Sequence, residues 1–141
     1  MAGIPLNTAL AIAQTAFAEG EARGVINMSV VVTDPGGHVR LAMRADGQGI
    51  FGVETAQGKC TAALGFNRTS LHLSKVFDNA AAVAAIQGAV KGKFVPLGGA
   101  VVVTDAAGEI VGAAGVSGGL PEVDEEIIVA AVEAANLKIL R

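Results

Sequence analysis

The stretch VVVTDPGGHV at residues 30–39 is closely repeated as VVVTDAAGEI at residues 101–110. In each copy a run of β-branched residues leads to an aspartate, and a glycine follows three residues later. β-Branched residues favour strands, an aspartate side chain can bond to the backbone of its own turn, and glycine accepts positive φ. The two copies therefore predict two β-hairpins. Because the similarity does not extend through the predicted helices, we interpret them as one turn used twice rather than as a duplicated gene.

Outside the hairpins, the spacing of apolar residues predicts four helices, at residues 6–22, 51–66, 78–92 and 121–140, with Asp78 as an N-cap. Short β-branched or alternating runs predict five strands, at residues 26–33, 38–44, 93–96, 98–104 and 109–116. Residues 66–78 are expected to be irregular. Strands joined mostly by hairpins, with helices before, between and after them, indicate an antiparallel sheet with helices packed on it, an α+β fold.

Length and composition limit the class of protein. The 141 residues suit a single domain, 1–141, which can bury enough surface to fold without a disulfide or a metal. Cys60 is the single cysteine, and zinc-site spacings of Cys and His are missing, so a disulfide scaffold and a zinc finger are excluded. A formal net charge of −3 gives no basic face for phosphates, so we expect no nucleic-acid partner. No apolar run reaches the length of a membrane span, and we expect no membrane partner.

The N-terminal segment resembles a secretion signal only superficially. Its first 18 residues are uncharged, but it lacks a basic start and polar residues interrupt the apolar stretch. We therefore predict the mature first helix of a cytoplasmic protein.

Assembly is predicted from the composition. Small residues are frequent along the predicted helices, and only 16% of the residues are charged. A monomer of this composition would expose large apolar patches, so we expect a homo-oligomer.

Four motifs together resemble the GlcG/HbpS family, the haem-degrading domain also found at the C-terminus of PduO. They are DPGGH at residues 34–38, ADG at 45–47, PLGGAVVV at 96–103 and GVSGGLPEVDE at 115–125. The resemblance covers nearly the whole chain in the right order. It implies a profilin-like fold, a five-stranded antiparallel sheet flanked by helices, that assembles as dimers or larger homo-oligomers. It also implies a small-molecule ligand, since some members of the family bind haem or iron.

Haem is the candidate cofactor that this resemblance suggests, but no axial ligand is carried over with it. Haem iron is usually held by His, Cys, Met or Tyr. Tyr is absent, so the candidates are His38, His72, Cys60 and the three methionines. The resemblance implies haem contacts from a His in the N-terminal helical region or from residues near the oligomer interface, and residues 6–23 contain no His. The metal ligands stay unassigned.

The GVSGG stretch is the first candidate ligand site. It comes directly before a predicted helix N-terminus, where free backbone N–H groups and the helix dipole can hold an anion such as a carboxylate. We predict ligand contacts from Ser117, Gly118, Gly119 and Glu122. The alternative is structural: the acids of the first helical turn already complement the dipole, and the glycines serve close packing.

Three further residues are predicted to carry chemistry. Lys59, on an Ala/Gly-rich helix, could bind an acidic substrate or, if desolvated, form a Schiff base or act as a base. His38 beside Asp34 could act as a general base or a metal ligand, and Asp34 is predicted to contact the ligand. Arg68 could hold a carboxylate in a pocket shared with His72. The alternatives are a solvated lysine, a pair that only fixes a turn, and a solvated loop at a subunit contact.

These observations favour a small-molecule binding protein whose pocket lies between the central helix, residues 66–78 and the GVSGG loop. The alternative is a cofactor-independent lyase, isomerase or hydrolase acting on a small acidic or carbonyl compound, with Lys59, His38 and Arg68 as its catalytic residues. A third reading is an accessory subunit without a ligand. P-loops, nucleophile elbows, HExxH motifs and paired CxxC motifs do not occur in the sequence.

Overall fold

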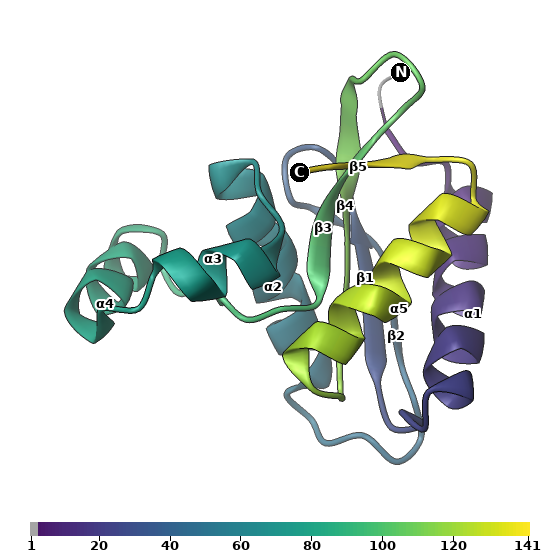
Figure 1. Ribbon diagram of the computed structural model, residues 1–141, viewed down its shortest axis with the longest axis horizontal. Helices are drawn as coiled ribbons and strands as arrows, with labels where there is room; N and C mark the ends of the chain where they lie inside the picture. Colours follow the sequence, from purple (N-terminus) through teal and green to yellow (C-terminus); the bar gives the residue numbers. More distant parts are fainter. Residues whose placement is uncertain (1–2) are drawn as a thin grey trace.

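Five antiparallel strands form one sheet, with helices on both of its faces (Figure 1). The computed structural model describes residues 3–141. In chain order the elements are α1 (Leu6–Ala22), β1 (Ser29–Thr33), β2 (Val39–Arg44), α2 (Gly52–Phe66), α3 (Ser70–Val76), α4 (Ala80–Ala89), β3 (Ala100–Thr104), β4 (Ile110–Ser117), α5 (Pro121–Ala134) and β5 (Lys138–Leu140). The strand order across the sheet is β2-β1-β4-β3-β5. The predicted α+β class with five antiparallel strands is confirmed.

The two hairpins fold alike, as their shared sequence predicts. In each, the register shifts by one residue just before the turn, at Val32/Thr33 and at Val103/Thr104. The Oδ1 atom of the turn aspartate accepts two backbone N–H groups of its own turn in both copies. The glycines that follow, Gly37 and Gly108, have φ of 83° and 87°. The prediction that Asp caps the turn and Gly supplies positive φ is confirmed.

The valine runs of β1 and β3 serve two cores because successive side chains point to opposite faces of a sheet. Val30, Val32, Val101 and Val103 pack with the buried sides of α1 and α5. Val31 and Val102 pack with Ala56, Cys60 and Ala63 of α2 on the other face. These valines are fully buried, as strands between two layers of helices require.

The central helix α2 lies close to the sheet because small residues face each other there. A Cβ built at Gly115 of β4 would lie 2.8 Å from Cys60 Sγ and 3.2 Å from the carbonyl oxygen of Ala56. A larger residue at 115 would push α2 away from the sheet. This close approach fixes the distance between α2 and the sheet. It thereby also fixes one wall of the pocket described below.

Residues 66–78 are more regular than the sequence analysis predicts. They contain the helix α3, whose first turn is capped by the side chain of Thr69, which accepts the backbone N–H of His72 at 3.2 Å. The next helix, α4, begins at Ala80 and is capped by Asn79 rather than by the predicted Asp78. Helices α3 and α4 extend from the α2 side of the molecule, with α4 farthest from the sheet (Figure 1).

The prediction of a strand at residues 93–96 is wrong. This segment bonds to α2 instead: the backbone N–H of Val95 donates to the carbonyl of Gly58 at 3.2 Å, and Thr61 Oγ1 donates to the carbonyl of Lys93 at 2.6 Å. A backbone held against a helix side chain and a helix carbonyl is not available for a sheet ladder.

The fifth strand is instead β5, in a segment predicted to be the end of the last helix. Helix α5 ends at Ala134, and Asn136 adopts the left-handed conformation with φ of 60°. Asparagine tolerates this conformation at a helix C-terminus, and the chain reverses there. Ile139 and Leu140 then pair with Val103 and Val102 of β3. Within the described residues no helix is both long and apolar enough to span a membrane.

Candidate functional site

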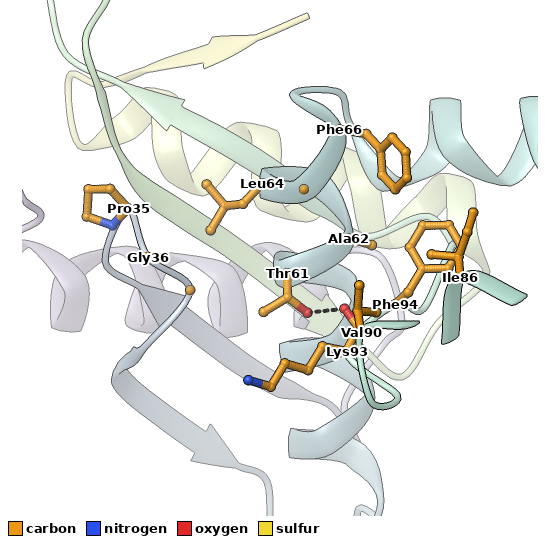
Figure 2. Close-up of a pocket in the computed structure, with 12 residues that line it drawn as sticks. Pro35, Gly36, Thr61, Ala62, Leu64, Phe66, Ile86, Val90, Lys93 and Phe94 are labelled. Carbon is orange, nitrogen blue, oxygen red and sulfur yellow. Dashed lines mark hydrogen bonds between the residues drawn. The ribbon is translucent and has the colours of Figure 1, made fainter. Parts of the chain in front are cut away.

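An apolar pocket of about 420 Å³ lies between the β1–β2 turn, α2 and the segment from α4 to Phe94 (Figure 2). Volumes of this order are typical of small-molecule sites. The turn contributes Pro35, Gly36 and Gly37. The remaining apolar walls come mainly from Leu64, Phe66, Ile86, Val90 and Phe94. We call this hollow the α2–α4 pocket.

Aromatic packing fixes the α4 side of this pocket. Phe66, Phe77 and Phe94 form a triangle with ring centroids 5.0 to 5.4 Å apart, in tilted and edge-to-face arrangements. These geometries are favourable for aromatic pairs. Phe94 is 1% exposed whereas Phe66 is 41% exposed. The cluster is therefore buried at Phe94 and accessible at Phe66, beside the pocket.

Lys93 supplies positive charge to the α2–α4 pocket. Its backbone is fixed by the hydrogen bond from Thr61 Oγ1 to its carbonyl, drawn in Figure 2. Its side chain is exposed, and in Figure 2 it extends toward the side of the pocket where Gly36 lies. An ammonium group beside apolar walls can bind the acidic group of an otherwise apolar molecule.

The β1–β2 turn, which forms one wall of the pocket, is held by Asp34. Its Oδ1 accepts the backbone N–H groups of Gly36 and His38, each at 2.9 Å, and lies 3.2 Å from Nδ1 of His38. The N–H of His38, followed by that of Gly36, holds the pKa of Asp34 below its usual value. His38 itself is exposed. The pair predicted from the sequence is therefore formed, and it organises the turn.

The GVSGG loop has a different arrangement, in which the chain supplies its own anion. The backbone N–H of Gly119 donates to Asp124 Oδ1 at 2.9 Å. Lys59 Nζ donates to Asp124 Oδ2 at 3.3 Å and to the carbonyl of Val116 at 2.9 Å. Both side chains are at most 5% exposed. An open hollow of about 610 Å³ does border Gly118 and Gly119, but the Gly119 amide points at Asp124.

Burial dominates the titration of this ion pair. Desolvation lowers the pKa of Lys59 and raises the pKa of Asp124, because both lose the hydration of their charged forms. Each partner opposes the shift of the other, and the amides of Gly119 and Gly118 also favour the charged carboxylate. The pair thus joins α2, β4 and the N-terminus of α5 in the interior of the protein.

Ser117 and Glu122, the other residues predicted around this loop, lie apart from each other. Ser117 is buried, and its Oγ donates to the carbonyl of Gly52 at 2.7 Å. Gln48, which the sequence analysis did not single out, donates from Nε2 to the carbonyl of Ser117 at 2.9 Å, and its Oε1 accepts from Ser29 Oγ. Glu122 is exposed in the first turn of α5.

Arg68 and His72 both lie on the surface. The Arg68 guanidinium donates to the carbonyl of its neighbour Asn67, and His72 is exposed in the first turn of α3. The predicted hollow between this segment and the GVSGG loop is occupied: a Cβ built at Gly98 would lie 2.8 Å from Leu71 Cδ1 and 2.7 Å from the carbonyl oxygen of Pro121. The α2–α4 pocket is lined instead by residues of the β1–β2 turn, α2 and the segment from α4 to Phe94.

The three proposed catalytic residues are thus not gathered around one hollow. Lys59 points into the interior, whereas His38 and Arg68 are exposed on other elements, and none of them is among the residues that line the α2–α4 pocket. Their catalytic roles stay predictions. Sequence reasoning missed Lys93 and Phe94, and the signal that could have found them is the cluster of three of the five phenylalanines within residues 66–94.

The candidate haem ligands are likewise not gathered around one hollow. Cys60 and Met28 are fully buried in the two cores, and burial raises the pKa of the Cys60 thiol to about 12. His38 and His72 are exposed on the β1–β2 turn and on α3. Met43 is half-buried on β2 against the first core, and Met1 lies outside the described residues. Across residues 3–141 there is no group of three or more His, Cys, Asp or Glu side chains able to hold a metal ion.

Fold and pocket together define a small α+β domain with an apolar hollow on the α2 side of its sheet. The family model described as haem degrading protein HbpS-like matches residues 4–133, so the chain belongs to the HbpS-like family. The search of curated proteins returned no match.

Solved structures share this fold over almost the whole chain. A PduOC:haem complex is 23% identical, covers 99% of both chains and has a TM-score of 0.86. A double mutant of Streptomyces reticuli HbpS is 26% identical, covers 95% of this chain and 88% of its own, and has a TM-score of 0.80. Protein ORFY of Klebsiella pneumoniae is 20% identical, covers 94% and 90%, and has a TM-score of 0.84.

Proposed function

We propose that this protein binds a small, largely apolar molecule that carries an acidic group, and that it does so in the α2–α4 pocket. The observation that carries the proposal is the combination of apolar walls with the Lys93 ammonium at the edge of the same hollow. Apolar walls provide most of the binding free energy of a small ligand, and one charged group fixes its orientation. Membership of the HbpS-like family supports a ligand-binding role.

Haem has the general character of such a ligand, with an apolar ring and two propionates, and one relative was crystallised as a haem complex. The fit of this chain to haem is partial. The lining of the α2–α4 pocket suits an apolar ring and an acidic group, but it contains no His, Cys, Met or Tyr to coordinate iron. The proposal therefore concerns the ring and the acid, and metal-free porphyrin is its most direct probe.

We also propose that the protein acts as a homo-oligomer. Ile26, Ile50, Phe51 and Leu120 are 66 to 71% exposed, and all four lie in the loops that join the helices to one end of the sheet. Large apolar side chains gathered in this way commonly mark interaction sites. Covering them requires a further protein surface, which a second copy of the chain would provide.

A titration with hemin and with protoporphyrin IX tests the ligand proposal. We expect saturable, stoichiometric binding of both compounds, followed by the absorbance and fluorescence of the porphyrin because the protein contains no Trp or Tyr. Absence of saturable binding for both compounds would refute the proposal and favour an accessory subunit. Binding of hemin alone would place the iron, and not the apolar acid, at the centre of recognition, which also contradicts it.

Gly65→Leu tests the position of the site. Gly65 lines the α2–α4 pocket, and a Cβ built there has no contact within 4 Å outside its own helix backbone, so a side chain can be accommodated at its base and would occupy space that the ligand needs. We expect porphyrin affinity to fall about tenfold or more, by the loss of roughly 1.4 kcal/mol of binding free energy. Gly49→Leu is the matched control, since a Cβ is also accommodated there and Gly49 lies outside this pocket. Equal affinities for the two variants would exclude this pocket as the site.

A further inference from the structure

Helix α4 is an apolar helix that the rest of the described chain does not cover. Its sequence is AAAVAAIQGA, and none of its ten residues is buried by residues 3–141. From residue 79 to residue 90 the chain carries no charged side chain. Figure 1 shows α4 at the periphery, beyond α3 and away from the sheet. A peripheral helix whose only polar side chain is Gln87 is unusual on a surface that faces water.

The two sides of α4 have different surroundings. Val83 and Ile86 pack against the cluster of Leu73 and Phe94, and Gln87 Nε2 donates to the carbonyl of Phe94 at 3.0 Å. The opposite side carries Ala81, Ala84, Ala85 and Gly88, which are exposed. These four residues are spaced by three and four positions and so form one face. Side chains this small allow the backbone of another helix to approach closely.

The charged residues next to α4 are arranged symmetrically. Asp78 lies two positions before the first residue of the helix, and Lys91 lies two positions after the last. Both are exposed, and neither forms an ion pair with any described residue. An acid before the helix and a base after it also agree with the helix dipole.

We infer that the Ala81–Gly88 face of α4 is a docking surface for a second copy of this chain, whose α4 packs against it in antiparallel orientation about a twofold axis. A twofold axis through the middle of the helix places Asp78 of each copy opposite Lys91 of the other. The same operation places Ala81 opposite Gly88 and Ala84 opposite Ala85. Charge complementarity and small-residue packing therefore select the same register, and the antiparallel helix dipoles favour it as well.

A stable interface needs roughly 600 Å² or more from each partner, which is more than one ten-residue helix provides. Contacts from elements next to α4 are therefore part of the interface, and Val76 at the end of α3 is an exposed apolar side chain, at 55%, that can contribute to them. Val90 and Phe66 line the α2–α4 pocket and are not counted with this face.

This inference rests on the homo-oligomer proposed above, and it assigns a contact between two copies to α4, separate from the exposed side chains of Ile26, Ile50, Phe51 and Leu120. The first test is Ala85→Arg, because a large charged side chain at the centre of the face blocks close approach while arginine keeps the helix propensity high. By analytical ultracentrifugation we expect the dissociation constant of the α4-mediated pair to rise about a hundredfold. Ala11→Arg, at an exposed position of α1, is the matched control and should leave the sedimentation unchanged.

Charge exchange tests the register. Asp78→Lys places lysines opposite one another, and we expect it to weaken self-association about tenfold. Adding Lys91→Glu to the same chain restores both intermolecular pairs, although both changes oppose the dipole of α4 itself. Recovery of association in the double variant thus supports the antiparallel pairing, and a further loss contradicts it.

Cysteine placement tests the orientation independently of stability. Under mild oxidation Ala85→Cys should give a disulfide-linked dimer of twice the 14.0 kDa chain mass, because position 85 lies next to its own copy. Ala81→Cys should not, because position 81 faces position 88. The wild type controls for Cys60, which is fully buried. Crosslinking of both variants would indicate parallel packing and overturn the assignment.

The outcomes separate the two proposals. A wild-type mass of 14.0 kDa at all concentrations would refute the homo-oligomer and this surface together. An oligomeric wild type whose mass is unchanged by Ala85→Arg would retain the homo-oligomer and refute only the α4 surface. Porphyrin binding with a monomeric wild type would leave the ligand proposal intact.

Discussion

Two lysines on the α2 side of the sheet show how differently the same residue type is used in this protein. Lys59 is 4% exposed and holds Asp124 and the carbonyl of Val116 beneath the GVSGG loop. Lys93 is exposed beside an apolar pocket, and none of the ion pairs among residues 3–141 involves it. The Lys59 ammonium is held in the interior by groups of its own chain, whereas the Lys93 ammonium is exposed and available to a ligand.

This comparison shows why GVSGGLPEVDE, the most recognisable motif, does not by itself locate the ligand site. A loop of glycines before a helix exposes backbone N–H groups that favour an anion. In this chain that anion is Asp124, which lies five residues after Gly119 within the same motif, and Lys59 neutralises it. The motif therefore organises the junction of β4, α2 and α5. The pocket is instead lined by residues that belong to no conspicuous motif, apart from the glycines of the β1–β2 turn.

The largest expected effect of a single substitution is that of Lys59→Met. It leaves the Asp124 carboxylate buried without its cation, and breaking a buried ion pair in this way typically costs about 3–5 kcal/mol. Urea unfolding at neutral pH measures the loss. Lys93→Met is the control and should change the free energy of unfolding by less than about 0.5 kcal/mol, because the side chain is exposed.

The double variant Lys59→Met with Asp124→Leu sharpens this prediction. Removing both charges also removes the cost of burying them, so most of the stability lost in Lys59→Met should return. If the double variant is as unstable as the single one, the loss comes from packing around position 59 and the ion pair is not its cause.

The loss caused by Lys59→Met should depend on pH. Burial already raises the pKa of Asp124, and removing Lys59 removes the neighbouring charge that opposes this rise. A carboxyl whose pKa is higher in the folded than in the unfolded state binds protons more tightly when folded, so stability falls as pH increases through the interval between the two values. The difference from wild type should therefore be smaller near pH 4, close to the ordinary pKa of an aspartate, than near pH 7. An equal difference at both pH values would contradict charge burial as the cause.

The smallest effect is expected for Lys93→Ala, and it should be confined to binding. Exposed ion pairs are worth about 0.2–1 kcal/mol, so the affinity for protoporphyrin IX should fall by a factor of about 1.4 to 5. Binding of the neutral dimethyl ester should not change. Lys138→Ala, at an exposed lysine of β5 outside the pocket lining, is the control for net charge. Equal losses in both variants would indicate general attraction rather than a contact from Lys93.

Much of the fold could be predicted from local sequence because its signals are local. The paired VVVTD stretches predict both hairpins, and apolar spacing locates α1 and α2 within a residue or so of their observed bounds. The errors occur where contacts distant in sequence decide the structure. Residues 93–96 pair with α2 and not with the sheet, and one left-handed residue, Asn136, converts the predicted end of a helix into β5.

The candidate site was less predictable for the same reason. His38 and Asp34 are close in sequence, and the contact predicted between them is present. Lys59 was identified as chemically distinctive, but its partner lies 65 residues away, and no local pattern indicates that the two meet. The α2–α4 pocket combines residues from 35 to 94, so it exists only once the turn, α2 and α4 are assembled.

The sequence by itself determined the α+β class, the two matching turns and the family, because these depend on side-chain alternation and on residues adjacent along the chain. The tertiary structure alone decided which lysine is buried and which is exposed, where the fifth strand lies, and that α4 is left uncovered. Each of these depends on which distant segments exclude water from one another, and burial, rather than residue type, determines whether a charge or an apolar face is available to a ligand or a partner.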